Sequence, residues 1–149
     1  MTPMGISEFQ RFFREAASLD VDKDDLRRYE EFVNRNVYDL LLMGQAKATA
    51  NGRDVIEPHD LPITKGLQET IHDFREMDEA AHLRPILEQM VALPTLDLVY
   101  SEETEVRLPG IAGGLSLALA RTFGIIDPKL ENPQTKHWDR AFRIFDLLL

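Results

Sequence analysis

Hydrophobic residues recur at intervals of three and four through most of the chain, the spacing that places them on one side of an α-helix. The longest such stripe begins after Asp24 or Asp25 and ends before Asn51-Gly52. It consists of Leu26, Tyr29, Val33, Val37, Leu40, Leu41 and Ala48. Acidic residues suit the positive end of a helix, and an Asn-Gly pair is typical of a C-terminal cap. The pattern therefore predicts one helix of about 26 residues, ~40 Å long.

Shorter helices are predicted on both sides of this long one. Ser7 can cap a first helix whose apolar side is Phe9, Phe12, Phe13 and Ala16. After the long helix, Arg53–Ile56 is short and β-like. Glu57-Pro58 then suits the start of a third helix, because proline is tolerated in a first turn. Its apolar positions extend to about Met77.

The second half of the chain repeats the order of a short, a long and a short helix. We expect the short helix at Arg84–Ala92, with Pro85 at its start, and the long helix at Glu102–Phe123. Gly124 to Pro128 resembles the helix end and short extended segment of the first half, and Asn132-Pro133 is expected to cap the last helix. Two similar sets of elements predict an all-α chain built from two related halves.

Composition and charge narrow the class of protein. Hydrophobic residues make up 44% and charged residues 29%, an ordinary globular balance. The first 75 residues carry 10 basic and 14 acidic side chains (−4), and the other 74 carry 7 and 12 (−5), for a net −9. Neither half is basic, so an acidic segment does not mask a nucleic-acid-binding domain. The absence of cysteine and of a signal-peptide pattern fits a cytoplasmic protein.

The longest apolar stretch is Leu108–Ile126, which contains Pro109, Arg121 and the glycines 110, 113 and 114. A membrane span needs about 20 mostly apolar residues, so these interruptions favour a buried helix, and we expect no membrane association. The glycines are followed by no Gly-Lys-Ser/Thr sequence, which excludes a phosphate-binding loop. We expect the small residues to allow close helix crossing.

The segment Asn51–Leu61, with sequence NGRDVIEPHDL, resembles the centre of the archaeal and eukaryotic histone fold. In that family a Gly-Arg loop follows the central helix, and its arginine pairs with an aspartate at the start of the last helix. The resemblance pairs Arg53 with Asp60 here, in a contact that can be bidentate. The second half matches only in its order of elements and has no comparable pair.

One chain with two histone-like halves is similar to a small bacterial family of single-chain histone pairs without an assigned role. The resemblance implies two histone-fold motifs, residues 1–77 and 78–149, packed as one intertwined intramolecular pseudodimer with crossing long helices. Joining the halves makes their pairing intramolecular, so we expect the single chain to fold without a partner.

The loop chemistry argues against a DNA-packaging role. Histones hold DNA through phosphate contacts made largely by basic residues. The loop Leu19–Asp25 instead carries four aspartates and one lysine, and Asp54 stands where DNA-binding relatives have a basic residue. Only Arg11, Arg14 and Lys129 remain as candidate DNA contacts.

Catalytic and metal-binding patterns are weak. Glu69–His72 and Glu79–His82 are both Glu-x-x-His, but on one continuous helix they would lie ~15 Å apart and could not share a metal. Only a break in the helix near Met77–Ala81 would allow them to do so. The serines lie in no nucleophile motif. We therefore expect no enzyme, no metal and no cofactor. The sequence favours a module that binds a protein partner or itself without packaging DNA; the alternative is weak, non-sequence-specific DNA binding.

Overall fold

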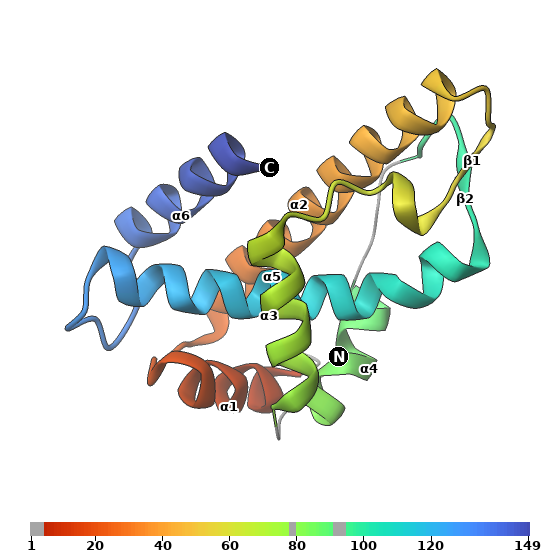
Figure 1. The fold of residues 1–149 in the computed structure, drawn as a ribbon. Helices are drawn as coiled ribbons and strands as arrows, with labels where there is room; N and C mark the ends of the chain where they lie inside the picture. The colour runs from red at the N-terminus through yellow and green to blue at the C-terminus, as the bar shows by residue number, and fades with distance from the viewer. Residues whose placement is uncertain (1–4, 78–79, 91–94) are drawn as a thin grey trace.

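The computed structural model describes residues 5–77, 80–90 and 95–149, and 75% of them are helical. This confirms the prediction of a mostly helical chain. The described elements, shown in Figure 1, are α1 (Ile6–Ala17), α2 (Lys23–Ala50), β1 (Val55–Ile56), the 3-10 turn η1 (Pro58–Asp60), α3 (Lys65–Glu76), α4 (Ala80–Met90), β2 (Val99–Tyr100), α5 (Glu102–Ile126) and α6 (Thr135–Leu148).

Helix α2 forms as the sequence predicts, and its start is fixed by a reciprocal cap. The Asp22 carboxylate accepts hydrogen bonds from the backbone N–H groups of Asp24 and Asp25, at 2.9 and 3.0 Å. The Asp25 carboxylate accepts one from the N–H of Asp22 at 3.0 Å. These bonds satisfy donors that a helix start leaves without a partner. The helix ends at Ala50, and Gly52 follows with a φ of 71°.

Helix α5 is the centre of the molecule. In Figure 1 it runs across the middle, α2 crosses it obliquely, and α3 lies in front of it. By length and composition α5 could cross a membrane, but 67% of its most apolar window is buried inside the protein. Its apolar surface is therefore covered by α1, α2, α3, α4 and α6, as expected for a core helix.

The predicted end of this helix is wrong. It continues through Gly124 to Ile126, and no strand follows it in residues 127–134. A glycine stops a helix when it adopts a positive φ, and Gly124 does not. The strand of the second half lies instead before α5, at Val99–Tyr100.

The predicted start of the third helix is also wrong. Pro58 opens only the 3-10 turn η1, and α3 begins at Lys65. Pro62 is the physical reason, because helical geometry is disfavoured for the residue before a proline. Leu61 is accordingly extended, with φ −73° and ψ 131°. The hydroxyl of Thr64 then caps α3 by accepting the N–H of Leu67 at 3.2 Å.

The two short helices of the second half differ from prediction by two to four residues. Helix α4 begins at Ala80, so Pro85 lies inside it and not at its start. The predicted C-terminal residues Val91 and Ala92 lie outside the described residues. Helix α6 begins at Thr135, and Gln134 takes the capping position expected for Asn132-Pro133. The N–H of Gln134 donates to Nδ1 of His137 at 2.9 Å.

Backbone hydrogen bonds join the connecting segments of the two halves at both ends of the long helices. At one end β1, which follows α2, pairs in parallel with β2, which precedes α5, with Val55 opposite Val99. At the other end the N–H of Asp20, before α2, donates to the carbonyl of Glu131, after α5, at 2.7 Å. Each half therefore supplies the partner segment for the other.

Helices α3 and α5 pack unusually closely because of two glycines. A Cβ atom at Gly113 would overlap the ring of Phe74, and one at Gly114 would overlap the side chain of Ile71. The same Cβ at position 114 would also lie 2.9 Å from the backbone nitrogen of Ile71. This confirms the prediction that the small residues allow close helix crossing.

Two side-chain hydrogen bonds in the core join α2 to the second half of the chain. The hydroxyls of Tyr29 in α2 and Ser116 in α5 lie 2.6 Å apart, at the helix crossing. Nε1 of Trp138 in α6 donates to the Asp25 carboxylate at 2.8 Å. Burial raises the pKa of Asp25 and of Tyr29, because the charged forms are poorly solvated there. These bonds tie the start and middle of α2 to the second half.

Candidate interaction surfaces

The structure brings Arg53 and Asp60 together in a bidentate ion pair. Nη1 and Nη2 of Arg53 each donate to one carboxylate oxygen of Asp60 at 2.6 Å. The Asp60 side chain is fully buried, whereas that of Arg53 is 33% exposed. Oδ2 of Asp60 also accepts the N–H of Glu57 at 2.8 Å. The bond from Arg53 is the main reason that the pKa of Asp60 lies far below its ordinary range.

The clamp formed by Arg53 and Asp60 has a mechanical role. Arg53 follows the end of α2, and Asp60 ends the 3-10 turn that follows β1. Their bond closes the loop that carries β1, and the carbonyl of Ile56 in that strand accepts the Thr104 hydroxyl of α5 at 2.9 Å. The clamp therefore holds one of the segments through which the first half contacts the second.

The candidate DNA contacts lie beside acidic groups. Arg14, on the exposed side of α1, lies with its Nη2 3.8 Å from Oδ1 of Asp20. Lys129 is exposed in the segment between Asp127 and Glu131. The bond from Asp20 to Glu131 places these acidic residues at one end of the molecule. Arg11 lies on α1 as well, at an exposed position.

The two Glu-x-x-His motifs form no metal site within the described residues. Oε1 of Glu69 accepts a hydrogen bond from Nζ of Lys65 at 2.7 Å. His72 and His82 are both exposed, on α3 and α4. Glu79 lies outside the described residues, so the second motif is described only in part.

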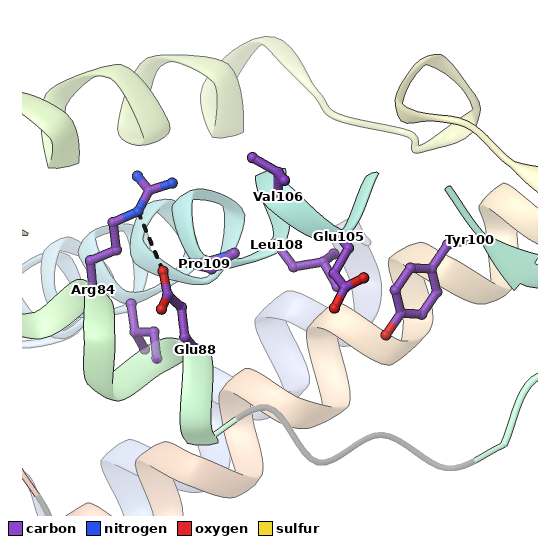
Figure 2. Close-up of a pocket in the computed structure, with 8 residues that line it drawn as sticks. Arg84, Glu88, Tyr100, Glu105, Val106, Leu108 and Pro109 are labelled. Atoms are coloured by element: carbon purple, nitrogen blue, oxygen red, sulfur yellow. Dashed lines mark ion pairs between the residues drawn. The ribbon is translucent and has the colours of Figure 1, made fainter. Parts of the chain in front are cut away.

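A first cleft, of about 440 Å³, lies between α4, β2 and α5. Figure 2 shows Arg84 and Glu88 on α4 facing Pro109 on α5, with Glu105 and Tyr100 further along the cleft. Arg84 and Glu88 lie 3.9 Å apart and are 42% and 56% exposed. Both charged side chains are therefore solvated.

A second, apolar groove of about 450 Å³ lies between α3 and α6 over the C-terminal half of α5. We call it the α3–α6 groove. Of its 13 lining residues only Arg121 has a charged side chain. Two of the lining residues are large apolar side chains that stand exposed, Ile125 (80%) and Leu148 (72%).

A third cleft, of about 450 Å³, lies on the other side of α3, between that helix, the η1 segment and α5. Two arginines line it, Arg75 from α3 and Arg107 from α5, so we call it the arginine cleft. Its other lining residues are Pro58, His59, Leu61, Ile63, Gln68, Ile71 and Ile111. Among the described residues, none that lines this cleft is acidic.

The family described as a domain of unknown function (DUF1931) matches residues 9–146, nearly the whole chain. The chain belongs to this family. An uncharacterized protein of Aquifex aeolicus (strain VF5) is 32% identical to it, over 79% of this chain and 76% of that protein. A second uncharacterized Aquifex aeolicus protein is 26% identical, over 78% of this chain and 68% of its own length.

Two crystal structures share this fold. One, of a protein from Thermus thermophilus, is 51% identical, covers 97% of both chains and has a TM-score of 0.85. The other, of a protein from Aquifex aeolicus, is 23% identical, covers 100% of this chain and 98% of its own, and has a TM-score of 0.87. The fold is thus kept in a protein with fewer than a quarter of its residues identical.

Neither the α3–α6 groove nor the arginine cleft was predicted from the sequence. The groove had one usable signal, the run Leu147–Leu149 at a helix end, where three successive residues cannot all face the core. The arginine cleft had none, because Arg75 and Arg107 are 32 positions apart on different helices.

Proposed function

We propose that this protein is a single-chain histone-fold pseudodimer that associates with a second copy of itself, has no enzymatic activity and does not package DNA. The exchange of segments supports the fold assignment. Residues after the first long helix pair with residues before the second, and residues before the first bond to residues after the second. A twofold pairing of two similar halves would give this reciprocal arrangement.

The α3–α6 groove carries the proposal of self-association. It combines a hollow with projecting apolar side chains, Leu148 on α6 and Ile125 on α5. A surface with both features can pair with itself around a twofold axis, because each copy inserts its ridge into the hollow of the other. Burial of exposed apolar surface supplies the driving force.

The charge distribution favours a second copy at this groove. Two chains of net charge −9 repel each other over most of their surfaces. The described lining of the groove carries no acidic side chain, and its one charged side chain, that of Arg121, donates to the Asp73 carboxylate at 3.0 Å. Association at this face therefore brings together weakly acidic surfaces of the two copies.

We expect Leu148→Asp to abolish self-association. The wild-type protein should approach dimer mass in sedimentation equilibrium as its concentration rises, and the variant should stay monomeric, because a carboxylate in the groove would be desolvated in the dimer. Val106→Asp is the matched control, since Val106 is 66% exposed on α5 but lines the cleft of Figure 2 instead.

The control variant should associate like the wild type. The monomeric Leu148→Asp protein should also keep its helical circular dichroism and melt at a temperature independent of concentration, because both halves are on one chain. A wild-type protein that is monomeric at every concentration, or equal loss in both variants, would refute the proposal.

Weak DNA binding is the second candidate function. It is supported by Arg11 and Arg14 on α1 and by Lys129, whose segment is joined to the one after α1 by the bond from Asp20 to Glu131. The acidic neighbours of Arg14 and Lys129 oppose it. We expect no change in the anisotropy of a labelled duplex at low or moderate salt. Binding that weakens steeply with salt would show phosphate contacts and contradict this expectation. Arg14→Gln and Lys129→Gln would then each reduce the salt dependence.

A further inference from the structure

We propose that the arginine cleft binds a small amphiphilic anion, a carboxylate or phosphate monoester attached to an aliphatic chain. This binding site is separate from the surface proposed for self-association, because the two lie on different sides of α3. Leu67 and Thr70 line the α3–α6 groove, whereas Gln68, Ile71 and Arg75 line the arginine cleft.

The two arginines of the cleft add positive charge to an acidic protein. Some arginines of the chain bind a nearby carboxylate, as Arg35 does with Asp146 at 2.6 Å and Arg121 with Asp73 at 3.0 Å. Within the described residues neither Arg75 nor Arg107 makes an ion pair. In a chain with 26 acidic and 17 basic residues, two such arginines in one cleft create a local site of positive charge among the described residues.

The helices place both arginines at the same part of α5. Arg75, in the last turn of α3, lies with Nη2 3.9 Å from the position that a Cβ atom would take at Gly110. Gly110 follows Arg107 by three residues, so the two lie on one face of α5. Guanidinium groups bind carboxylates and phosphates through paired N–H donors, and two at one site recognise an anionic head group.

The rest of the cleft suits an aliphatic chain. Four of its lining residues are large aliphatics, namely Leu61, Ile63, Ile71 and Ile111. Its volume of about 450 Å³ falls in the range of small-molecule sites, roughly 300–1,000 Å³. Small-molecule sites combine apolar side chains with a few polar or charged groups that orient the ligand. Charge at one place and apolar surface beside it together specify an amphiphilic anion.

The test is a titration of the full-length protein with octyl phosphate and with octanoate below their micelle concentrations, followed by amide chemical shifts in NMR. We expect shifts centred on α3 and α5. Arg75→Gln and Arg107→Gln should each weaken binding at least about tenfold, the loss of a charge-assisted hydrogen bond. Arg140→Gln, at an exposed position of α6 outside the cleft, should bind like the wild type.

The melting temperature without ligand shows whether a variant loses binding because the site has changed or because the whole protein is less stable. Arg107→Gln should melt at or above the wild-type temperature, because it removes one of two like charges, while the gain in stability from ligand disappears. A preference for octyl phosphate or for octanoate would identify the head group. Equal binding of octanol or of inorganic phosphate, an equal loss in Arg140→Gln, or no binding of either probe would overturn the proposal.

Discussion

The Gly114→Ala variant is expected to be less stable than the wild-type protein by about 3 kcal/mol, at the upper end of the cost of overpacking a core. The added methyl group would overlap the side chain of Ile71 and lie 2.9 and 3.0 Å from its backbone nitrogen and Cα. A side chain can change its rotamer, but a helix backbone cannot move without shifting all of α3. The cost should therefore exceed that of most methyl insertions.

Gly124→Ala is the matched control for this experiment. Gly124 lies on the same helix, and a Cβ atom there would meet nothing within 4 Å. Alanine should stabilise the helix at this position by about 0.5–1 kcal/mol, because glycine loses more backbone entropy on folding. Urea unfolding measures both changes. A lower free energy of unfolding for Gly114→Ala, together with a higher one for Gly124→Ala, would support close packing of α3 on α5. A Gly114→Ala protein as stable as the wild type would contradict it.

Arg53→Gln is expected to lower the melting temperature by about 5–10 °C, and Asp60→Asn by less. The asymmetry follows from burial. Without Arg53, the Asp60 carboxylate remains fully buried, with the N–H of Glu57 and the more distant His59 as its other neighbours. Without the Asp60 charge, Arg53 is still 33% exposed and can be solvated by water. Differential scanning calorimetry of the two variants tests this order, and a larger loss in Asp60→Asn would contradict it.

The clamp should also make stability depend on pH at the acidic end. The folded protein lowers the pKa of Asp60 below its ordinary 3.8, so the ion pair contributes its full stability above that pH. The contribution is lost as pH falls below 3.8 toward the pKa of the folded state. The difference in melting temperature between the wild type and Asp60→Asn should therefore shrink below about pH 4. A difference independent of pH would show that the pair adds no charge-dependent stability.

The helix boundaries predicted from the sequence were wrong where a glycine or proline can either end or extend a helix. Gly124 could end a helix or continue it, and only the helical φ that the surrounding structure permits decides which. Pro58 could likewise begin a helix, but Pro62 four residues later forces Leu61 into an extended conformation and delays α3 to Lys65. The second proline was the stronger signal, because its steric effect on the preceding residue is local.

Sequence patterns predicted a helix correctly wherever its apolar residues lie along one side of that helix. The stripe from Leu26 to Ala48, the acidic start and the Asn51-Gly52 end defined α2 to within two residues, because each depends on neighbours in the same helix. The sequence by itself thus determined that the chain is mostly helical and that α5 is buried, and the resemblance of its Asn51–Leu61 segment implied the pairing of Arg53 with Asp60. Tertiary structure alone decided the surfaces on which the proposals rest. Arg75 and Arg107 line one cleft, and Leu148 lines a groove with Leu67, only because α3 and α6 pack against α5. Packing between segments that are distant in the sequence leaves no periodic pattern in the chain.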